Sequence, residues 1–221
     1  MPIDRKDLQN TLIEMKRLYE SDPKKAVRSQ EMIKLLHDFS VQELKRLGIS
    51  EKEVTIRTEA RIFGSHKPKE VDVAVIHPQA GPLIVISLRS QMSSIEKNFA
   101  NYYEGIIGDV ISLHGKYPDL VIGQIYLLPK RTIIKDKNGH TRKESHDLEK
   151  KEPLFLRIAN RKNGTDRMDK YEHVAFLAVD FLKNPPEVLD IPKDPILRIE
   201  DFYDKLLATY QERNPFLDIL E

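Results

Sequence analysis

The chain opens with apolar residues at helical spacing. The stretch 4–20 places leucine or methionine at every third or fourth position, which predicts a helix with Asp4 as its N-cap. Two further helices are predicted, one after Pro23 and one from about Ser40 to residue 48, where a glycine ends the pattern. We therefore expect residues 1–50 to form a helical region packed on the rest of the chain.

A second pattern, alternating and rich in β-branched residues, begins at Val54 and predicts strands. Strands are expected at 54–64, 71–76, 83–91, 120–129 and 173–181. Polar turns separate the first three, which indicates antiparallel pairing. The segment 83–91 is nearly continuously apolar, as in a central strand covered on both faces.

Helices are predicted between and after these strands. Ser93 and Glu96 have the spacing of a capping box, so a helix is expected from there to about His114. Within it, Gly105 and Gly108 indicate close packing of the helix against the sheet. Shorter helical patterns cover 154–162 and 198–213.

The order of the elements predicts an α/β fold with a central mixed β-sheet flanked by helices. Residues 51–221 would form one domain, on which the N-terminal helices pack. Between them, 130–152 is predicted to be a basic loop or hairpin, because Asn138 and Gly139 are a turn signal.

Composition removes several classes of protein. The chain has no cysteine, which excludes disulfide frameworks, thiolate metal sites and cysteine nucleophiles. No apolar run reaches the roughly 18 residues of a membrane span, and the N-terminus lacks an apolar signal core. We therefore expect a cytoplasmic protein with no membrane partner.

The distribution of charge is uneven although the net charge is only +1. Residues 130–151 carry eight basic and four acidic side chains, whereas 180–221 carry five basic and ten acidic ones. A polyanion would be held at the basic region. The alternative is an exposed, lysine-rich loop. The seven histidines are scattered and are interpreted as surface or structural residues.

Chemistry-bearing residues gather between 70 and 104. Asp72 lies near the start of one predicted strand, and Ser87, Arg89 and Gln91 lie at the end of the next. Alternation puts these last three side chains on one face of their strand. A helix N-terminus follows, and its free N–H groups favour a nearby anion.

An acid on one strand, a hairpin, a polar residue two positions before a cation and then a helix resemble the core of the PD-(D/E)xK nucleases. The segment GPLIVISLRSQMSSIEKNF is most similar to type II restriction-endonuclease-like proteins. The resemblance covers about 54–128. It implies a restriction-endonuclease-like core and a Mg²⁺-dependent endonuclease that hydrolyses phosphodiester bonds in specific double-stranded DNA. It also implies that Asp72 and the carbonyl of Leu88 are metal ligands, with Arg89 in the position of the family's lysine.

The chain departs from the family pattern at three positions. Val71 stands where the family has proline, Ser87 replaces the second acid, and Arg89 replaces the lysine. Arginine stays charged, so it would stabilise a phosphate but not act as a general base.

The missing carboxylate has several candidates. Some restriction enzymes with Ser-x-Lys take it from the following helix, and Glu104 resembles that arrangement. On an ideal helix, however, Glu104 lies opposite the apolar stripe. Glu70 and Glu59 remain alternatives, and Gln91 is expected to complete the metal shell or to contact the phosphate.

In a nuclease, the two basic stretches would flank the DNA. Phosphate contacts are expected from Lys130, Arg131, Lys135, Lys137, Arg142 and Lys143, and base contacts from Arg157, Asn160, Arg161, Lys162 and Asn163. Cutting both strands usually requires two active sites, so a homodimer is expected. Other readings stay open: a non-catalytic nuclease-fold DNA-binding protein, a repair or junction nuclease, and a protein-interaction domain.

Overall fold

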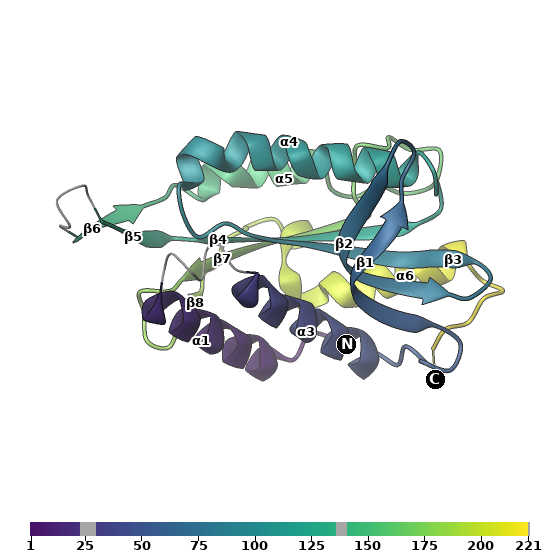
Figure 1. The fold of residues 1–221 in the computed structure, drawn as a ribbon, viewed down its shortest axis with the longest axis horizontal. Helices are drawn as coiled ribbons and strands as arrows, with labels where there is room; N and C mark the ends of the chain where they lie inside the picture. Colours follow the sequence, from purple (N-terminus) through teal and green to yellow (C-terminus); the bar gives the residue numbers. More distant parts are fainter. Residues whose placement is uncertain (23–29, 136–140, 221) are drawn as a thin grey trace.

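The protein is built from a mixed β-sheet between two layers of helices (Figure 1). A computed structural model describes residues 1–22, 30–135 and 141–220. Within them, six strands pair in the order β1-β2-β3-β4-β7-β8. Their bounds are β1 (Thr55–Phe63), β2 (Pro68–His77), β3 (Gly81–Ser90), β4 (Val121–Pro129), β7 (His173–Asp180) and β8 (Glu187–Val188). The prediction of an α/β fold with a central mixed sheet flanked by helices is confirmed.

The sheet changes from antiparallel to parallel pairing at β3. The strands β1, β2 and β3 pair antiparallel, as the polar turns between them predicted, whereas β3, β4 and β7 pair parallel. A parallel neighbour requires a crossover connection. The helix α4 (Ile95–His114) makes it between β3 and β4.

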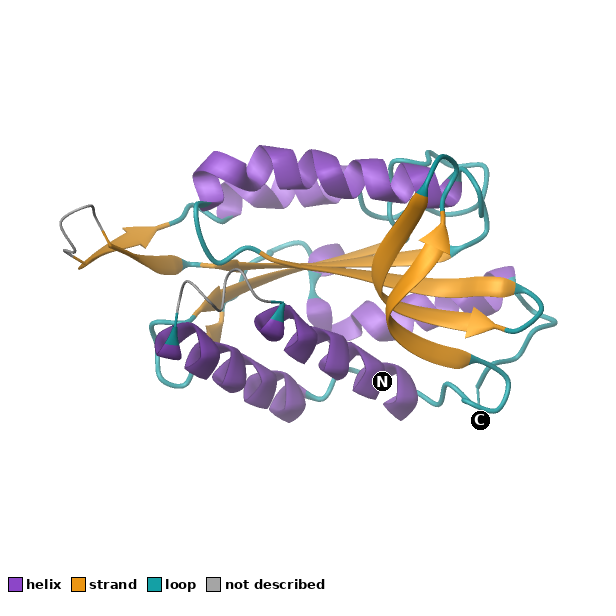
Figure 2. Ribbon diagram, viewed as in Figure 1, coloured by secondary structure: helices purple, strands orange, loops and turns teal. Residues whose placement is uncertain are grey.

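Helices cover both faces of the sheet (Figure 2). One face carries α4 and α5 (Glu152–Arg157), and the other carries α1 (Arg5–Ser21), α3 (Glu31–Arg46) and α6 (Phe202–Arg213). Short 3₁₀ turns precede α5 and α6, namely η1 (Glu149–Lys151), η2 (Pro195–Leu197) and η3 (Ile199–Asp201).

Alternation along β3 divides its side chains between these two layers. Ile86 and Leu88 belong to the core beneath α1, α3 and α6, while Val85 belongs to the core beneath α4. All nine residues of β4 are buried. The strands β3 and β4 are therefore covered on both faces, as the apolar pattern of 83–91 predicted.

The N-terminal region differs from expectation in one respect. Asp4 caps α1 as predicted, accepting hydrogen bonds from the N–H groups of Lys6 and Asp7. The two helices predicted next are one continuous helix where described, because Ser40 does not cap a new helix. Its hydroxyl is buried and lies 2.8 Å from the hydroxyl of Tyr203. Residues 23–29 lie outside the described residues.

The start of α4 also corrects the prediction. Its N-cap is Ser94, in the left-handed region with φ 50°, and no side-chain cap bond forms there. Glu96 pairs with Lys151 instead of completing a capping box. Gly105 and Gly108 do not mark close packing, since a Cβ at either would meet nothing within 4 Å.

The basic region 130–152 contains a hairpin that extends beyond the main sheet (Figure 1). It pairs β5 (Arg131–Lys135) with β6 (Thr141–Ser145) in antiparallel register. The turn signal at 138–139 and the candidate Lys137 lie outside the described residues. None of the described helices is long and apolar enough to cross a membrane.

Candidate functional site

A pocket with a volume of about 250 Å³ opens where β2 and β3 separate. Their ladder ends at the pair Val73–Ile86. Beyond it, the Oδ2 of Asp72 accepts a hydrogen bond of 2.6 Å from the N–H of Leu88. A side-chain carboxylate thus replaces the strand backbone as the partner of β3, which fixes Asp72 at the point of separation.

The pairing of β1 with β2 is also interrupted beside Asp72. The register places Glu59 opposite Asp72. In the described ladder these two residues do not pair, although the residues on either side of them do. Glu59 has a φ of 51°, a left-handed conformation that is unusual for a residue other than glycine. Its exposed carboxylate lies 3.6 Å from Lys34 and does not line the pocket.

The pocket brings together five of the residues expected from the sequence, from two adjacent strands. Side chains from more distant elements complete its polar lining. The polar and charged lining comprises Gln30, Glu70, Asp72, Ser87, Arg89, Ser90, Asp109, Gln124 and Tyr171, with Leu88 among the apolar residues. The carboxylate of Asp72 and the guanidinium of Arg89 therefore line the same pocket, as the hairpin pattern predicted.

Arg89 is the cation of this pocket. Its guanidinium lies over the ring of Tyr102, 5.2 Å from the centroid. The buried Nε has no hydrogen-bond partner among the described residues. The aromatic ring from α4 thus holds the guanidinium while hydrogen-bonding capacity is left over for an anion.

The carboxylate that α4 contributes is Asp109, and the structure does not bring Glu104 to the pocket. At 100° per residue, Tyr102, Ile106 and Asp109 lie on one side of the helix, and Glu104 lies opposite. Glu104 is exposed, whereas Asp109 lines the pocket and bonds the Nζ of Lys69 at 2.5 Å. Asp109 lies three residues after Ile106, a spacing that puts both side chains on one side of the helix, and this spacing was the signal for Asp109 in the sequence.

Gln91 takes a structural place rather than the expected one at a metal or phosphate. Its side chain is buried, and its Nε2 donates to the carbonyl of Ile95 at 3.2 Å. Its Oε1 accepts a 3.0 Å bond from the hydroxyl of Tyr126. Because β3 ends at Ser90, the alternation that grouped residues 87, 89 and 91 does not extend to Gln91.

Two further polar groups come from neighbouring elements. Gln124 lies beside Ser87 in the parallel ladder, and its buried Oε1 has no hydrogen-bond partner among the described residues. Tyr171 donates its hydroxyl to the carbonyl of Ile106, and burial raises the pKa of this phenol well above its ordinary value. Tyr171 therefore forms a neutral wall of the pocket.

One histidine approaches the central acid, which the sequence did not indicate. The Nε2 of His37, on α3, lies 3.2 Å from the Oδ1 of Asp72. The side chain of His37 is only 4% exposed. Both oxygens of Asp72 therefore have a neighbour, Leu88 on one side and His37 on the other.

The donor atoms of the pocket are of the kind that Mg²⁺ prefers. Carboxylates, an amide and a hydroxyl are hard oxygen donors. Within the described ranges, no three histidine, aspartate or glutamate side chains form a group that could hold a metal ion. Mg²⁺ is commonly held by one or two carboxylates together with water and substrate phosphates, so the residues present fit this ion in chemistry.

Three of the candidate DNA-contacting cations have partners within the protein. The Nζ of Lys130 bonds the carbonyl of His146 at 3.2 Å, and Arg131 forms a paired interaction with Asp180 at 2.5 and 3.1 Å. Arg161 is buried, so the expectation that it reads DNA bases is not supported.

The other candidates lie mostly at the surface. Exposed side chains are those of Arg142, Lys143, Arg157, Lys162 and Asn163. Asn160 is half-buried and has a φ of 66°. The backbone of Lys135 lies in β5, and its side chain is outside the described part of the structure.

Arg161 belongs to a buried ionic cluster around Glu172. This carboxylate accepts hydrogen bonds from Arg161 at 2.9 Å and from Arg213 at 2.8 Å, and the Nε2 of His114 lies 3.3 Å away. Burial alone would raise the pKa of Glu172. The bond and charge of His114, the charge of Arg213 and the N–H of Ile122 outweigh it and lower the pKa to about 2.

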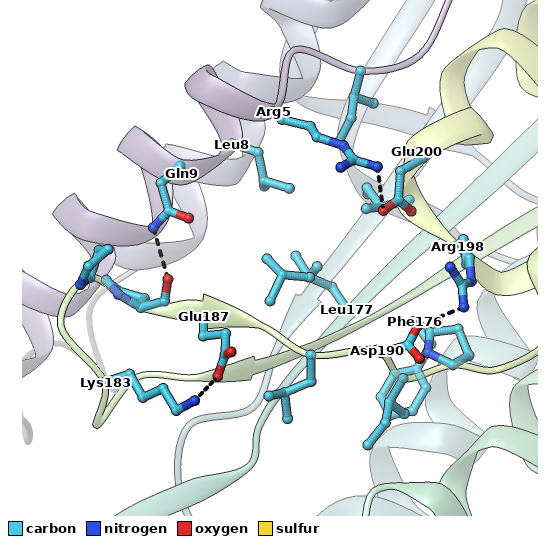
Figure 3. Close-up of a pocket in the computed structure, with 18 of the residues that line it drawn as sticks. Arg5, Leu8, Gln9, Phe176, Leu177, Lys183, Glu187, Asp190, Arg198 and Glu200 are labelled. Carbon is cyan, nitrogen blue, oxygen red and sulfur yellow. Dashed lines mark hydrogen bonds and ion pairs between the residues drawn. The ribbon is translucent and has the colours of Figure 1, made fainter.

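A larger pocket of about 710 Å³ lies between α1 and the segment around β8 (Figure 3). None of the residues expected from the sequence lines it. The charged side chains seen there are paired with one another: Arg5 with Glu200, Lys183 with Glu187, and Arg198 with Asp190. The smaller pocket is therefore the better candidate for chemistry on a charged substrate.

Comparison of the chain with family models, with curated proteins and with solved structures finds no significant match. The arguments for a function therefore come from the pocket itself.

Proposed function

We propose that the protein is a Mg²⁺-dependent DNA endonuclease that hydrolyses phosphodiester bonds, of the type that cuts a specific double-stranded sequence. The observation that carries the proposal is the meeting of Asp72 and Arg89 in one pocket, with Glu70 and Asp109 as further carboxylates. An acid fixed by a backbone N–H could hold a metal ion against a phosphodiester, and a cation lining the same pocket could balance the negative charge of the phosphate.

Each side chain has a role in this proposal. Asp72, with Glu70 or Asp109, would hold the metal ion. When bound, Mg²⁺ supplies positive charge against the phosphate and lowers the pKa of a water molecule. Arg89 would stabilise the negative charge that develops on the phosphate, and Ser87 would orient one of its oxygens by hydrogen bonding.

The surface supports DNA as the substrate. Arg142 and Lys143 are exposed on the β5–β6 hairpin, and Arg157 and Lys162 are exposed in the second basic stretch. Cations at these places would contact phosphates and give an affinity that falls with salt concentration. A homodimer would supply the second active site needed to cut both strands.

The test is nicking of supercoiled plasmid DNA with Mg²⁺. We expect Asp72→Asn to reduce the rate at least 100-fold, since it removes a charged ligand while keeping the side-chain shape. Asp38→Asn is the matched control, because Asp38 is an exposed acid on α3 next to His37. Equal nicking by the wild type and Asp72→Asn would reject the assignment of Asp72.

A second candidate is a non-catalytic DNA-binding protein with the same fold. It is favoured by Ser87 and Arg89, which replace the second acid and the lysine of the resembled nucleases. Salt-dependent DNA binding without cleavage, in Mg²⁺ and in Mn²⁺, would support this candidate over the endonuclease.

A further inference from the structure

We propose that Gln124 positions the water molecule that attacks the phosphate, by accepting a hydrogen bond from it. The inference rests on the proposed function and adds to it the residue that orients the nucleophile. The sequence pattern did not indicate this residue, because Gln124 lies within the apolar run that forms β4.

Gln124 lies on the same face of the sheet as Ser87 and Arg89. The parallel ladder pairs Gln124 with Ser87, and paired residues direct their side chains to one face. Alternation along β3 puts Arg89 on that face as well. Ile122 and Tyr126, two positions to either side of Gln124, belong to the core beneath α4. Gln124 therefore lines the pocket from the side of the sheet that α4 covers.

The amide oxygen of Gln124 is left without a partner. The side chain is fully buried, and its Nε2 donates to the carbonyl of Ile125 at 2.9 Å, which fixes the orientation of the amide. Its Oε1 has no hydrogen-bond partner among the described residues. A buried acceptor in this state is costly, because it has lost its hydrogen bonds to water. A donor bound in the pocket would remove that cost.

The chemistry of this oxygen selects water as the donor. An amide oxygen only accepts hydrogen bonds, and the oxygens of a phosphodiester are acceptors too, so the two groups do not bond each other directly. A water molecule donates one O–H to the amide and keeps a lone pair for the phosphorus atom. The pocket volume of about 250 Å³ is far larger than the roughly 30 Å³ that a water molecule occupies.

The cation of the pocket does not serve this purpose. Arg89 stands where the resembled nucleases have a lysine, and its guanidinium stays charged and only donates hydrogen bonds. In the hydrolysis step, the water oxygen bonds to phosphorus while the bond from phosphorus to the leaving oxygen breaks. Gln124 accepts a hydrogen bond but not the proton, which passes to solvent, and the leaving oxygen takes a proton from solvent.

The kinetic experiment compares variants that keep the size of the side chain. The assay is nicking of plasmid DNA with Mg²⁺ under single-turnover conditions. Gln124→Met removes the acceptor, and we expect the rate to fall about 100-fold through loss of orientation, with unchanged DNA affinity in the absence of metal. Gln124→Glu keeps an acceptor oxygen whether or not its carboxyl group is ionised, so it should recover most of the rate.

The matched control is Gln42→Met, since Gln42 is an exposed glutamine on α3, and it should nick DNA as fast as the wild type. Thermal melting establishes which variants are folded. A crystal structure of the protein without DNA gives a readout that does not depend on cleavage. We expect an ordered water molecule about 3 Å from Oε1 of Gln124 in the wild type and none at that place in Gln124→Met.

The outcomes separate this inference from the proposed function. If the wild type cuts DNA and Gln124→Met cuts it as fast, or if no water is bound to Oε1, the inference fails and the endonuclease proposal stands. A Gln124→Glu variant as slow as Gln124→Met also overturns the inference, because the acceptor would then not matter. If Gln124→Met does not fold, the bound water and the rate of Gln124→Glu decide. A wild type that cuts no DNA refutes the proposed function, and this inference with it.

Discussion

The buried cluster around Glu172 allows a quantitative prediction about stability. Replacing Glu172 with glutamine keeps the size of the side chain and removes its charge. Arg161 and Arg213 would then be left with an amide where they now share a carboxylate. Because Arg161 and Glu172 have fully buried side chains, water would not compensate for the loss.

The magnitude follows from the pKa of this carboxyl group. Folding lowers it from 4.5 to about 2. At 1.36 kcal/mol per pKa unit, a shift of that size corresponds to about 3 kcal/mol of folding free energy at neutral pH. Removing one partner from a buried ion pair typically costs about 3–5 kcal/mol, which is the same range. We therefore expect Glu172→Gln to destabilise the protein by about 3 kcal/mol.

Urea unfolding at pH 7 measures this change. With a slope of about 3 kcal/mol per molar, the midpoint should fall by about 1 M. The control is Asp147→Asn, which breaks an ion pair between exposed side chains, Lys150 and Asp147. Because water screens an ion pair between exposed side chains, we expect the control to leave the urea midpoint close to that of the wild type.

The pH dependence provides a second check on the same group. The folded-state pKa of Glu172 lies below its unfolded-state value, so its stabilisation is present above pH 4.5 and is lost as the pH falls toward 2. The stability difference between the wild type and Glu172→Gln should therefore narrow over that interval. A shift of the urea midpoint below about 0.2 M at pH 7, or a difference that does not depend on pH, would refute the reasoning.

Two comparisons test other parts of the structure. Gly123→Ala should destabilise the protein by about 1–3 kcal/mol, because the Cβ of the new alanine would lie 2.5 Å from a ring carbon of Phe202. Gly105→Ala should instead stabilise the protein by about 0.5–1 kcal/mol, because the new Cβ would lie in open space on α4. Thermal or urea unfolding of both variants checks this, and equal effects would contradict the packing. In the plasmid assay, Asp109→Asn should reduce nicking at least tenfold and Glu104→Gln should not; the opposite result would restore Glu104 as the carboxylate from the helix.

The sequence alone was sufficient for features that depend on neighbouring residues. Alternation and turn signals predicted the hairpin of β2 and β3, and a hairpin necessarily brings residues at its two open ends together. This is why the sequence alone predicts that Asp72, Ser87 and Arg89 belong to one site. The cap at Asp4 was predicted for the same reason, since the cap and its N–H partners lie within three residues.

Local patterns also misled where a tertiary contact decided the outcome. Ser40 has the chemistry of an N-cap, but its bond to Tyr203 places it inside a continuous helix. Arg161 lies in a basic stretch, so its sequence context indicates a surface cation. In the structure its guanidinium is buried against Glu172. Tyr203 is 163 residues from Ser40, and Glu172, 11 residues from Arg161, lies beyond the reach of a local pattern. Charge and helix propensity therefore did not indicate either contact.

What only the tertiary structure decided is which side chains complete the pocket. Asp109 reaches the pocket from a helix on one face of the sheet, and His37, which does not line the pocket, contacts Asp72 from a helix on the other face. Sequence periodicity fixes the face of a helix on which a residue lies, but not the point on the sheet over which that helix packs. That position is set by the fit of many side chains in two separate cores, and no single segment of the chain encodes it.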